Sequence, residues 1–208
     1  MPEPNAPHPP DWDERYAVEG WAFGSEPNDF LREHAHFLPP AGRVLCLAEG
    51  EGRNAVHLAR LGHEVTGVDL SSVGLAKAQK LAASFGMRLH TEVADLATWP
   101  IAPGAWDGIV SIFAHVPRDV RLALHPRVVA GLKPGGVLLL EAYRPEQLGR
   151  DGGGPTDDSK LMTLAQLRDE LAGLEFTIAR EIEREVVEGR YHSGMAAVVQ
   201  IVGRKPLR

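Results

Sequence analysis

The sequence predicts an α/β domain built on a mostly parallel sheet, and three observations lead to this prediction. Between residues 43 and 143, short apolar runs typical of buried strands alternate with segments of helical periodicity. The joints between them are short and rich in glycine, which is typical of a parallel sheet covered on both faces. Two further strand-like runs, 175–187 and 191–204, are separated only by a short turn, so they must pair antiparallel.

The N-terminal region reads differently from the rest of the chain. Residues 1–10 contain five prolines and are expected to form a mobile tail, which leaves 11–208 as a single domain. Residues 11–24 are dense in large aromatic side chains but show no strand or long-helix pattern. Residues 27–40 predict a helix that ends at two prolines. We expect 11–40 to form a cap over one edge of the domain.

The remaining elements follow in order along the chain. A long glycine-rich segment, 149–160, is expected to be either a functional lid or a disordered loop. Pro126 predicts a kink or a break in its helix. The expected strands of the parallel part span 43–49, 63–70, 87–95, 106–113 and 137–143. The expected helices span 53–62, 71–86, 118–136 (with its closing turn) and 162–174.

Composition excludes several classes of protein. With 22 Lys and Arg against 28 Asp and Glu, the formal net charge of −6 argues against a nucleic-acid partner. The apolar runs are too short to cross a bilayer, and the first residues lack the features of a secretory signal. Cys46 is the only cysteine, so no intrachain disulfide can form. We therefore expect a cytoplasmic protein that acts on a small molecule, without a membrane partner; its oligomeric state stays open.

Metal binding is not expected from the histidine pattern. His34 and His36 are two positions apart on a predicted helix, so they cannot face one ion. The remaining His, Asp and Glu residues show no spacing typical of metal ligands. Cys46 lies in the middle of a predicted strand and is expected in the core. The charged run 180–190 is expected to be the solvated face of a strand.

Four groups of residues fall where predicted strands end. They are the turn 49–54 (EGEGRN), Asp69, Asp95 and the segment 111–115 (SIFAH). In open α/β sheets, ligands bind outside the carboxyl ends of the strands. Two glycines in the first turn allow a ligand to approach the backbone, and an acid at the end of the second strand can accept hydrogen bonds from both hydroxyls of a ribose. The groups together predict a site for an adenosine-containing cofactor.

The charges of the first turn favour one kind of cofactor over another. Glu49 and Glu51 would repel the pyrophosphate of a nicotinamide dinucleotide, and Ala55 stands where such a loop has its third glycine. S-adenosylmethionine has no phosphate and carries a cationic ammonium and sulfonium. An acidic turn therefore favours S-adenosylmethionine.

These segments resemble the class I S-adenosylmethionine-dependent methyltransferases. The resemblance rests on GEGRN after the first strand, on VTGVDLS, VADL and WDGIVSIF, and on LKPGG. The segments WDERY, FGSEPNDFL and SIFAHVP are similar to the branch that contains the tellurite-resistance and thiopurine methyltransferases. The resemblance implies a Rossmann-like, doubly wound sheet of seven strands. It also implies in-line methyl transfer to a small acceptor, such as a thiol, selenium or tellurium species, with S-adenosylhomocysteine as product.

The resemblance implies roles for individual residues. Glu49 and the 50–52 backbone would lie by the methionine, Asp69 would hold the ribose, and Asp95 with Leu96 would flank the adenine. Many relatives have Asp-x-Gly-x-Gly in the first turn, whereas here the acid directly precedes the first glycine, which could shift contacts by one residue. The full set of expected cofactor contacts is Tyr16, Trp21, Glu49, Gly50, Glu51, Gly52, Asn54, Asp69, Leu70, Ala94, Asp95, Leu96, Ser111 and Phe113.

Several of these residues also have a plain structural interpretation. Asp69 could only cap a helix, Asp95 could be a turn residue, and the aromatic residues of 11–24 could be packing rather than a lid. A thiolate acceptor needs no base, whereas a hydroxyl or amine acceptor would need one, for which His115 and Tyr16 are the candidates. His115 could equally be a structural histidine whose ring nitrogens are satisfied within the fold. Two other functions stay open: a non-catalytic sensor that binds S-adenosylmethionine, and a nicotinamide-dependent oxidoreductase.

Overall fold

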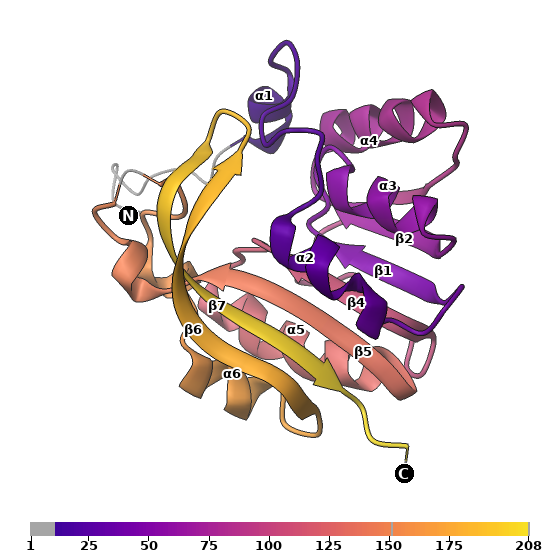
Figure 1. Cartoon of the computed structure of the whole chain (residues 1–208), viewed down its shortest axis with the longest axis vertical. Helices are drawn as coiled ribbons and strands as arrows, with labels where there is room; N and C mark the ends of the chain where they lie inside the picture. Colours follow the sequence, from indigo (N-terminus) through magenta and orange to yellow (C-terminus); the bar gives the residue numbers. More distant parts are fainter. Residues whose placement is uncertain (1–10, 151, 208) are drawn as a thin grey trace, which may run out of the picture.

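The computed structural model describes residues 11–150 and 152–207 and contains a seven-stranded sheet in the order β3-β2-β1-β4-β5-β7-β6 (Figure 1). β1 to β5 pair parallel, whereas β7 runs antiparallel to both β5 and β6. The predicted fold class is therefore confirmed. The strands are β1 (Arg43–Leu47), β2 (Glu64–Asp69), β3 (His90–Val93), β4 (Trp106–Ile112), β5 (Leu132–Tyr143), β6 (Glu175–Glu188) and β7 (His192–Arg204).

Helices cover both faces of this sheet, as the alternating pattern predicts. α2 and α3 lie over one face and α5 and α6 over the other, while α4 lies beside α3 (Figure 1). The residues expected to be a mobile tail, 1–10, lie outside the described part of the chain. The helices are α1 (Trp12–Tyr16), α2 (Asp29–His34), α3 (Arg53–Arg60), α4 (Ser72–Ser84), α5 (Arg118–Gly131) and α6 (Leu164–Glu170), with short 3-10 turns at Ala35–Phe37, Pro145–Gln147 and Asp158–Lys160.

The side chains of β1 show how the two layers form. Val44 and Cys46 point to one face and pack with α2 and α3, whereas Leu45 and Leu47 point to the other and pack with α5. Successive residues of a strand face opposite sides, so an uninterrupted apolar run is what a strand buried on both faces requires. Cys46 is fully buried and unpaired, as predicted.

Two details differ from the sequence prediction. α5 continues through Pro126 without a break, and Leu122, whose carbonyl loses its helical partner, lies on the exposed side of the helix. β5 begins at Leu132, earlier than expected, because Leu132 already pairs with Trp106 before the register shifts between Trp106 and Gly108. Neither difference moves the carboxyl ends of the strands.

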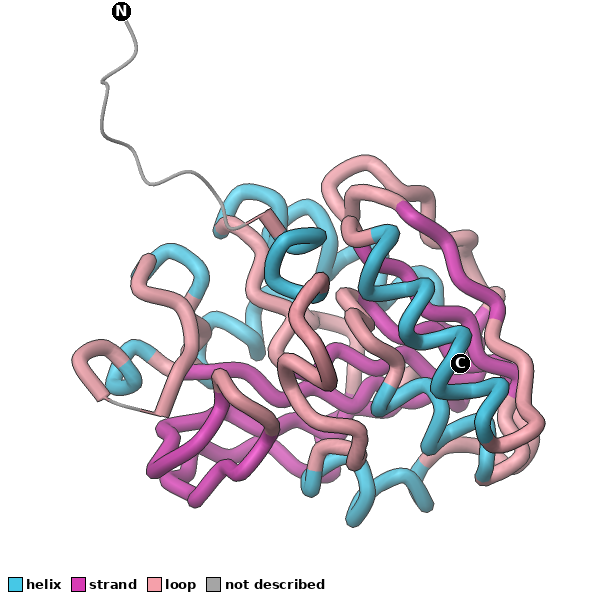
Figure 2. The backbone as a smooth tube through the Cα atoms, turned by 90° about the horizontal axis from the view of Figure 1, so that it is seen from above, coloured by secondary structure: helices cyan, strands magenta, loops and turns pink. Residues whose placement is uncertain are grey.

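Two segments far apart in sequence meet beyond that edge of the sheet. The β6–β7 hairpin extends past the sheet and its tip lies beside the segment that follows α1 (Figures 1 and 2). The N–H of Arg190 donates to the carbonyl of Ala22 at 2.8 Å. Gly24 and Gly189 touch there, since a Cβ on Gly24 would lie 3.3 Å from the backbone nitrogen of Gly189. The N-terminal segment and the hairpin tip thus close over the same edge.

α1 is held in place by the start of α4. The Asp13 carboxylate accepts hydrogen bonds from the Ser71 hydroxyl and, at 3.2 Å, from the N–H of Val73. Ser71 in turn caps α4 by accepting the N–H of Gly74. This joint places Tyr16 over the carboxyl edge of the sheet. Within residues 11–150 and 152–207, no helix has the length and apolarity that crossing a membrane would need.

Packing predicts a difference between two glycines that both have a φ of +93°. A Cβ on Gly52 would lie 2.6 Å from the Cα of Ala78, whereas a Cβ on Gly62 would have no neighbour within 4 Å. We expect Gly62→Ala to cost about 1–2 kcal/mol from backbone strain alone. Gly52→Ala should cost about 1–3 kcal/mol more through overpacking, measured by urea unfolding. Equal losses of stability would contradict the packing of α4 on this turn.

Candidate functional site

The turn after β1 is built for close approach. Three of its residues have left-handed backbone: Ala48 (φ 48°), Gly50 (φ 61°) and Gly52 (φ 93°). A Cβ on Gly50 would lie 2.5 Å from the Tyr16 hydroxyl oxygen, so Tyr16 sits directly on the turn. Glycine at position 50 is therefore required both by the backbone conformation and by this neighbour.

Asp69 ties this turn to the end of β2. Its carboxylate accepts hydrogen bonds from the N–H of Gly50 and the N–H of Ser71, each at 2.8 Å, one on each oxygen. Burial raises the pKa of this carboxyl above its ordinary value. Each oxygen keeps a lone pair free, so the group can accept further hydrogen bonds from a ligand. Asp69 thus does more than cap α4, a role for which Ser71 already suffices.

The next strand end lies beside Asp69. The N–H of Ala94 donates to the Asp69 carbonyl at 2.9 Å, which brings the turn after β3 to the turn after β2. Asp95 accepts the N–H of Ala97 through Oδ1 and is exposed, while Leu96 is buried in the core. Leu70 is 56% exposed, an apolar side chain facing solvent next to two carboxylates. These residues offer a flat apolar contact and acceptors for an exocyclic amine.

The two glutamates of the turn have partners inside the protein. Glu49 points under the turn, where it accepts the N–H of Ala55 at 2.8 Å, and burial raises its pKa to about 7. Glu51 accepts the N–H of Ala22 at 2.8 Å and pairs with Lys77 at 2.7 Å. The predicted charge effect is therefore wrong for Glu51, because Lys77 neutralises it and the carboxylate holds the N-terminal segment.

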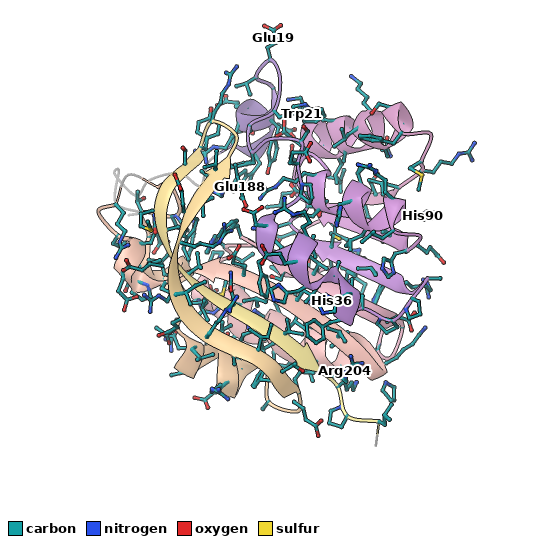
Figure 3. The ribbon with its side chains drawn as sticks, viewed as in Figure 1. Glu19, Trp21, His36, His90, Glu188 and Arg204 are labelled. Carbon is teal, nitrogen blue, oxygen red and sulfur yellow. The ribbon has the colours of Figure 1, made fainter. Side chains whose placement is uncertain are left out.

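Two other predicted cofactor contacts are used elsewhere in the fold. The Asn54 side-chain oxygen accepts the N–H of Asn28 at 3.0 Å and so ties α3 to the start of α2. Trp21 lies beside α4, where it packs against the Val56 and Leu81 cluster and the Lys77 ammonium lies 5.7 Å from its ring (Figure 3).

Aromatic side chains of the N-terminal segment cover the turn. Tyr16 lies against both Gly50 and Gly74, Trp12 stacks on Tyr16 at 5.7 Å, and Phe23 meets its edge at 6.1 Å. Burial and the nearby carboxylates raise the pKa of the Tyr16 hydroxyl far above neutral. The geometry favours a lid, and the raised pKa disfavours the predicted role of Tyr16 as a base.

His115 also differs from its predicted role as a base. Its Nε2 accepts the N–H of Tyr143 at 3.3 Å, and Nδ1 lies 3.1 Å from the Lys160 carbonyl, to which it donates. Burial lowers its pKa to about 4. Both ring nitrogens are taken by backbone groups, so His115 is a structural link between β5 and the 158–161 segment. Ser111 is buried at the end of β4, and Phe113 follows it with a left-handed φ of 53°.

The sequence missed an ionic network that reaches the site from the hairpin. Glu188 pairs with Arg53 at 2.6 Å and accepts from Asn28 at 2.9 Å, while Arg184 pairs with Glu141 at 2.7 Å. The prediction of a solvated strand face is wrong for Arg184 and Glu188, whose side chains are only 14% and 6% exposed. Their spacing of two from Ile182 and Val186 was the available signal, since alternate residues share one face.

A group of rings joins this network at the hairpin. The aromatic cluster consists of Phe23, Phe113, Tyr143, Tyr191 and His192. Phe113 stacks on Tyr143 at 4.5 Å, and both meet the ring of His192 edge-on. Within the described residues, His, Cys, Asp and Glu side chains form no group of three or more that could hold a metal ion.

Comparison with known proteins agrees with this geometry. Residues 44–136 match the model of the methyltransferase domain family. YqeM of Bacillus subtilis, named as a methyltransferase, is 33% identical over 111 residues, which cover 51% of this chain and 44% of that protein. A ubiquinone/menaquinone biosynthesis C-methyltransferase, UbiE of Geotalea daltonii, is 35% identical over 51% of this chain and 48% of its own. The chain thus spans about half the length of the curated relatives it matches.

Solved structures share the fold over most of the chain. TehB from Haemophilus influenzae superposes with a TM-score of 0.72 and 21% identity, over 86% of this chain and 62% of that one. A methyltransferase described as S-adenosylmethionine-dependent, from Methanosarcina mazei, gives 0.69 and 18%, over 88% and 100%. Over most of its length, the chain therefore has the fold of these two solved structures. The match to the methyltransferase domain family covers residues 44–136, just under half of the chain.

Lys77 is predicted to hold the N-terminal segment in place, because it donates to the carbonyls of Val18 and Gly20 as well as to Glu51. Lys77→Met removes these bonds and leaves the buried Glu51 carboxylate without its cation. Amide exchange at Ala22 and Phe23 should become about tenfold faster or more, since ~1.4 kcal/mol corresponds to a factor of ten. Lys80→Met, on the exposed side of α4, should leave exchange unchanged. Unaltered exchange in Lys77→Met would refute the tie.

The raised pKa of Glu49 predicts a dependence of stability on pH. Its ordinary pKa is 4.5 and its folded value is about 7, so the native state binds the proton more tightly and stability falls as pH rises from about 4.5 to 7. Glu49→Gln keeps an acceptor for Ala55 and removes the charge. We expect it to gain on the order of 1–3 kcal/mol over the wild type at pH 8 and nothing at pH 4. Unfolding curves across this range would contradict this if the difference were constant.

Proposed function

We propose that this protein transfers the methyl group of S-adenosylmethionine to a small-molecule acceptor. The observation that carries the proposal is the Asp69 carboxylate, which joins the glycine turn to the end of β2 and keeps lone pairs free beside exposed Leu70. A ribose diol would bind Asp69, and an adenine ring would lie on Leu70 with Asp95 accepting from its amine. The methionine part would lie along the glycine turn, beside Tyr16.

The residues present fit this cofactor better than a dinucleotide. A pyrophosphate usually binds free N–H groups at the N-terminus of the helix after the first strand. In α3 the N–H of Ala55 already donates to Glu49, and Tyr16 lies on the Gly50 turn. The N-terminus of α3 is thus partly capped by the protein's own acid, which disfavours a phosphate and tolerates a cationic amino-acid moiety.

Methyl transfer requires the protein mainly to align the methyl donor with the acceptor and to exclude water. When bound, S-adenosylmethionine supplies an electrophilic methyl group and leaves as neutral S-adenosylhomocysteine. Trp12, Tyr16 and Phe23 cover the turn and exclude water, and aromatic faces also attract a sulfonium. Holding donor and acceptor in line can supply roughly 7–11 kcal/mol of the barrier. No preorganised site for a developing anion is required, because the leaving group is uncharged.

Three features support a small acceptor with a soft nucleophile. The hairpin tip and the N-terminal segment are in contact over the site, which favours a small molecule over a polymer. The net charge of −6 disfavours nucleic acid as the acceptor. Neither Tyr16 nor His115 is a free base, which favours an acceptor that loses its proton readily, such as a thiol or a heavier chalcogen. The tellurite-resistance and thiopurine branch remains our proposal for its nearest relatives.

Calorimetry tests the cofactor assignment. S-adenosylhomocysteine should bind and NADH should not. Asp69→Asn should weaken binding about 10- to 100-fold, since it replaces charged hydrogen bonds worth ~1.5–3 kcal/mol. Glu64→Gln changes an exposed acid at the other end of the same strand and should bind as the wild type does. Binding of NADH, or equal affinity in Asp69→Asn, would contradict the proposal; binding without turnover on any thiol, selenide, phenol or amine would indicate a sensor.

A further inference from the structure

His192 lies at the start of β7, with its ring in the aromatic cluster. Its Nδ1 is buried without a hydrogen-bond partner in the described residues and lies 3.7 Å from Oε2 of Glu188. Its ring packs against Phe23 at 4.6 Å, Phe113 at 5.0 Å and Tyr143 at 5.4 Å. Within residues 11–150 and 152–207, Nε2 of His192 forms no hydrogen bond, whereas both ring nitrogens of His115 do.

The neighbours of His192 come from several segments at the carboxyl edge of the sheet. Phe113 follows β4, Tyr143 ends β5, and Phe23 belongs to the lid that rests on Tyr16. Glu188 connects the hairpin to the glycine turn, because it pairs with Arg53, the residue directly after that turn. Glu188 lies between the hairpin and the carboxyl edge of the sheet (Figure 3). His192 therefore lies where the hairpin meets the ends of β4 and β5 and the N-terminal segment.

Resting on the proposed function, we infer that His192 is the general base that takes the proton of the methyl acceptor, and that Glu188 is the positioning residue that orients its ring. The acceptor's proton passes to Nε2, the electron pair that it leaves forms the new bond to the methyl carbon, and the pair of the broken S–CH3 bond stays on sulfur. The proton later leaves to solvent. A carboxylate behind one ring nitrogen and a free second nitrogen is the arrangement that such a base needs.

Glu188 is suited to orient the ring because it is itself fixed and charged. Arg53 and Asn28 hold its two oxygens at 2.6 and 2.9 Å. Burial alone would raise its pKa, but His192 and Arg53 outweigh burial and lower the pKa to about 2. An ionised Glu188 favours the tautomer with the proton on Nδ1, facing the carboxylate, which leaves the lone pair on Nε2.

The other groups around His192 keep its ring neutral at working pH. Burial lowers its pKa, Glu188 opposes this, and the cations of Arg53 on α3 and Arg15 on α1 reinforce it. Tyr143 on β5 and the neutral His115 add no charge at pH 7, because their pKa values are raised and lowered, respectively. The base therefore starts in its proton-accepting form.

This role narrows the class of acceptor. A base is useful only for a protic nucleophile that is mostly un-ionised at neutral pH, such as an alkyl thiol or a phenol. An acceptor that is already an anion gains nothing from it. The aromatic cluster around His192 further favours an acceptor with an apolar body.

The tautomer of His192 tests the inference without an acceptor. In 15N-labelled full-length protein, saturated with S-adenosylhomocysteine and assigned with His192→Gln, the imidazole nitrogens should show an Nδ1–H tautomer at pH 7. Exposed His36 serves as the reference ring, assigned with His36→Gln. An Nε2–H tautomer or a charged ring at pH 7 would overturn the inference. Failure of S-adenosylhomocysteine to bind would instead count against the proposed function.

Two acceptors of different acidity provide the kinetic test. With 2-mercaptoethanol, His192→Gln should lose about 10²–10⁴ in kcat/KM, whereas with 4-nitrothiophenol, already a thiolate at neutral pH, it should stay within about twofold of wild type. His36→Gln should match the wild type with both, and calorimetric affinity for S-adenosylhomocysteine should be unchanged in both variants. Equal losses on the two thiols, or no loss on the first, would overturn the inference. If the wild type methylates neither thiol, the tautomer alone decides.

Discussion

The carboxylate of Asp69 is the contact on which the rest of the site depends. By accepting the N–H groups of Gly50 and Ser71, it fixes the turn after β1, the end of β2 and the start of α4 relative to one another. Ser71 then donates to Asp13, which sets α1 and with it Tyr16 over the turn. Asp69 therefore fixes both the binding edge of the sheet and, through Ser71 and Asp13, the position of Tyr16. It does so with lone pairs to spare, which is why the same group can serve both the fold and a ligand.

The electrostatic logic of the site differs from what the bare sequence indicates. Two acids beside paired glycines indicate an open negative surface. In the structure, however, Glu51 pairs with Lys77 and holds the N-terminal segment, and Glu49 lies beneath the turn, where it accepts the N–H of Ala55. The discrimination against phosphate now rests on a filled helix N-terminus rather than on exposed charge. This effect is local and little screened by salt, because the Glu49–Ala55 hydrogen bond is buried.

The fold and the binding edge could be predicted because they depend on local patterns. The apolar run of β1 and the period of α3 place Gly50, Asp69 and Asp95 at strand ends, and the structure brings these ends together as the parallel sheet requires. The fates of Glu51, Asn54 and His115 could not be predicted in this way. Each is decided by a partner distant in sequence, respectively Lys77, Asn28 and Lys160. Local periodicity contains no information about such pairings.

A crystal structure with S-adenosylhomocysteine tests the central claim most directly. The account predicts that both ribose hydroxyls donate to the Asp69 carboxylate while the hydrogen bonds from Gly50 and Ser71 persist, with the homocysteine part beside Tyr16. A complex in which the ribose binds elsewhere, and Asp69 contacts only the protein, would contradict it.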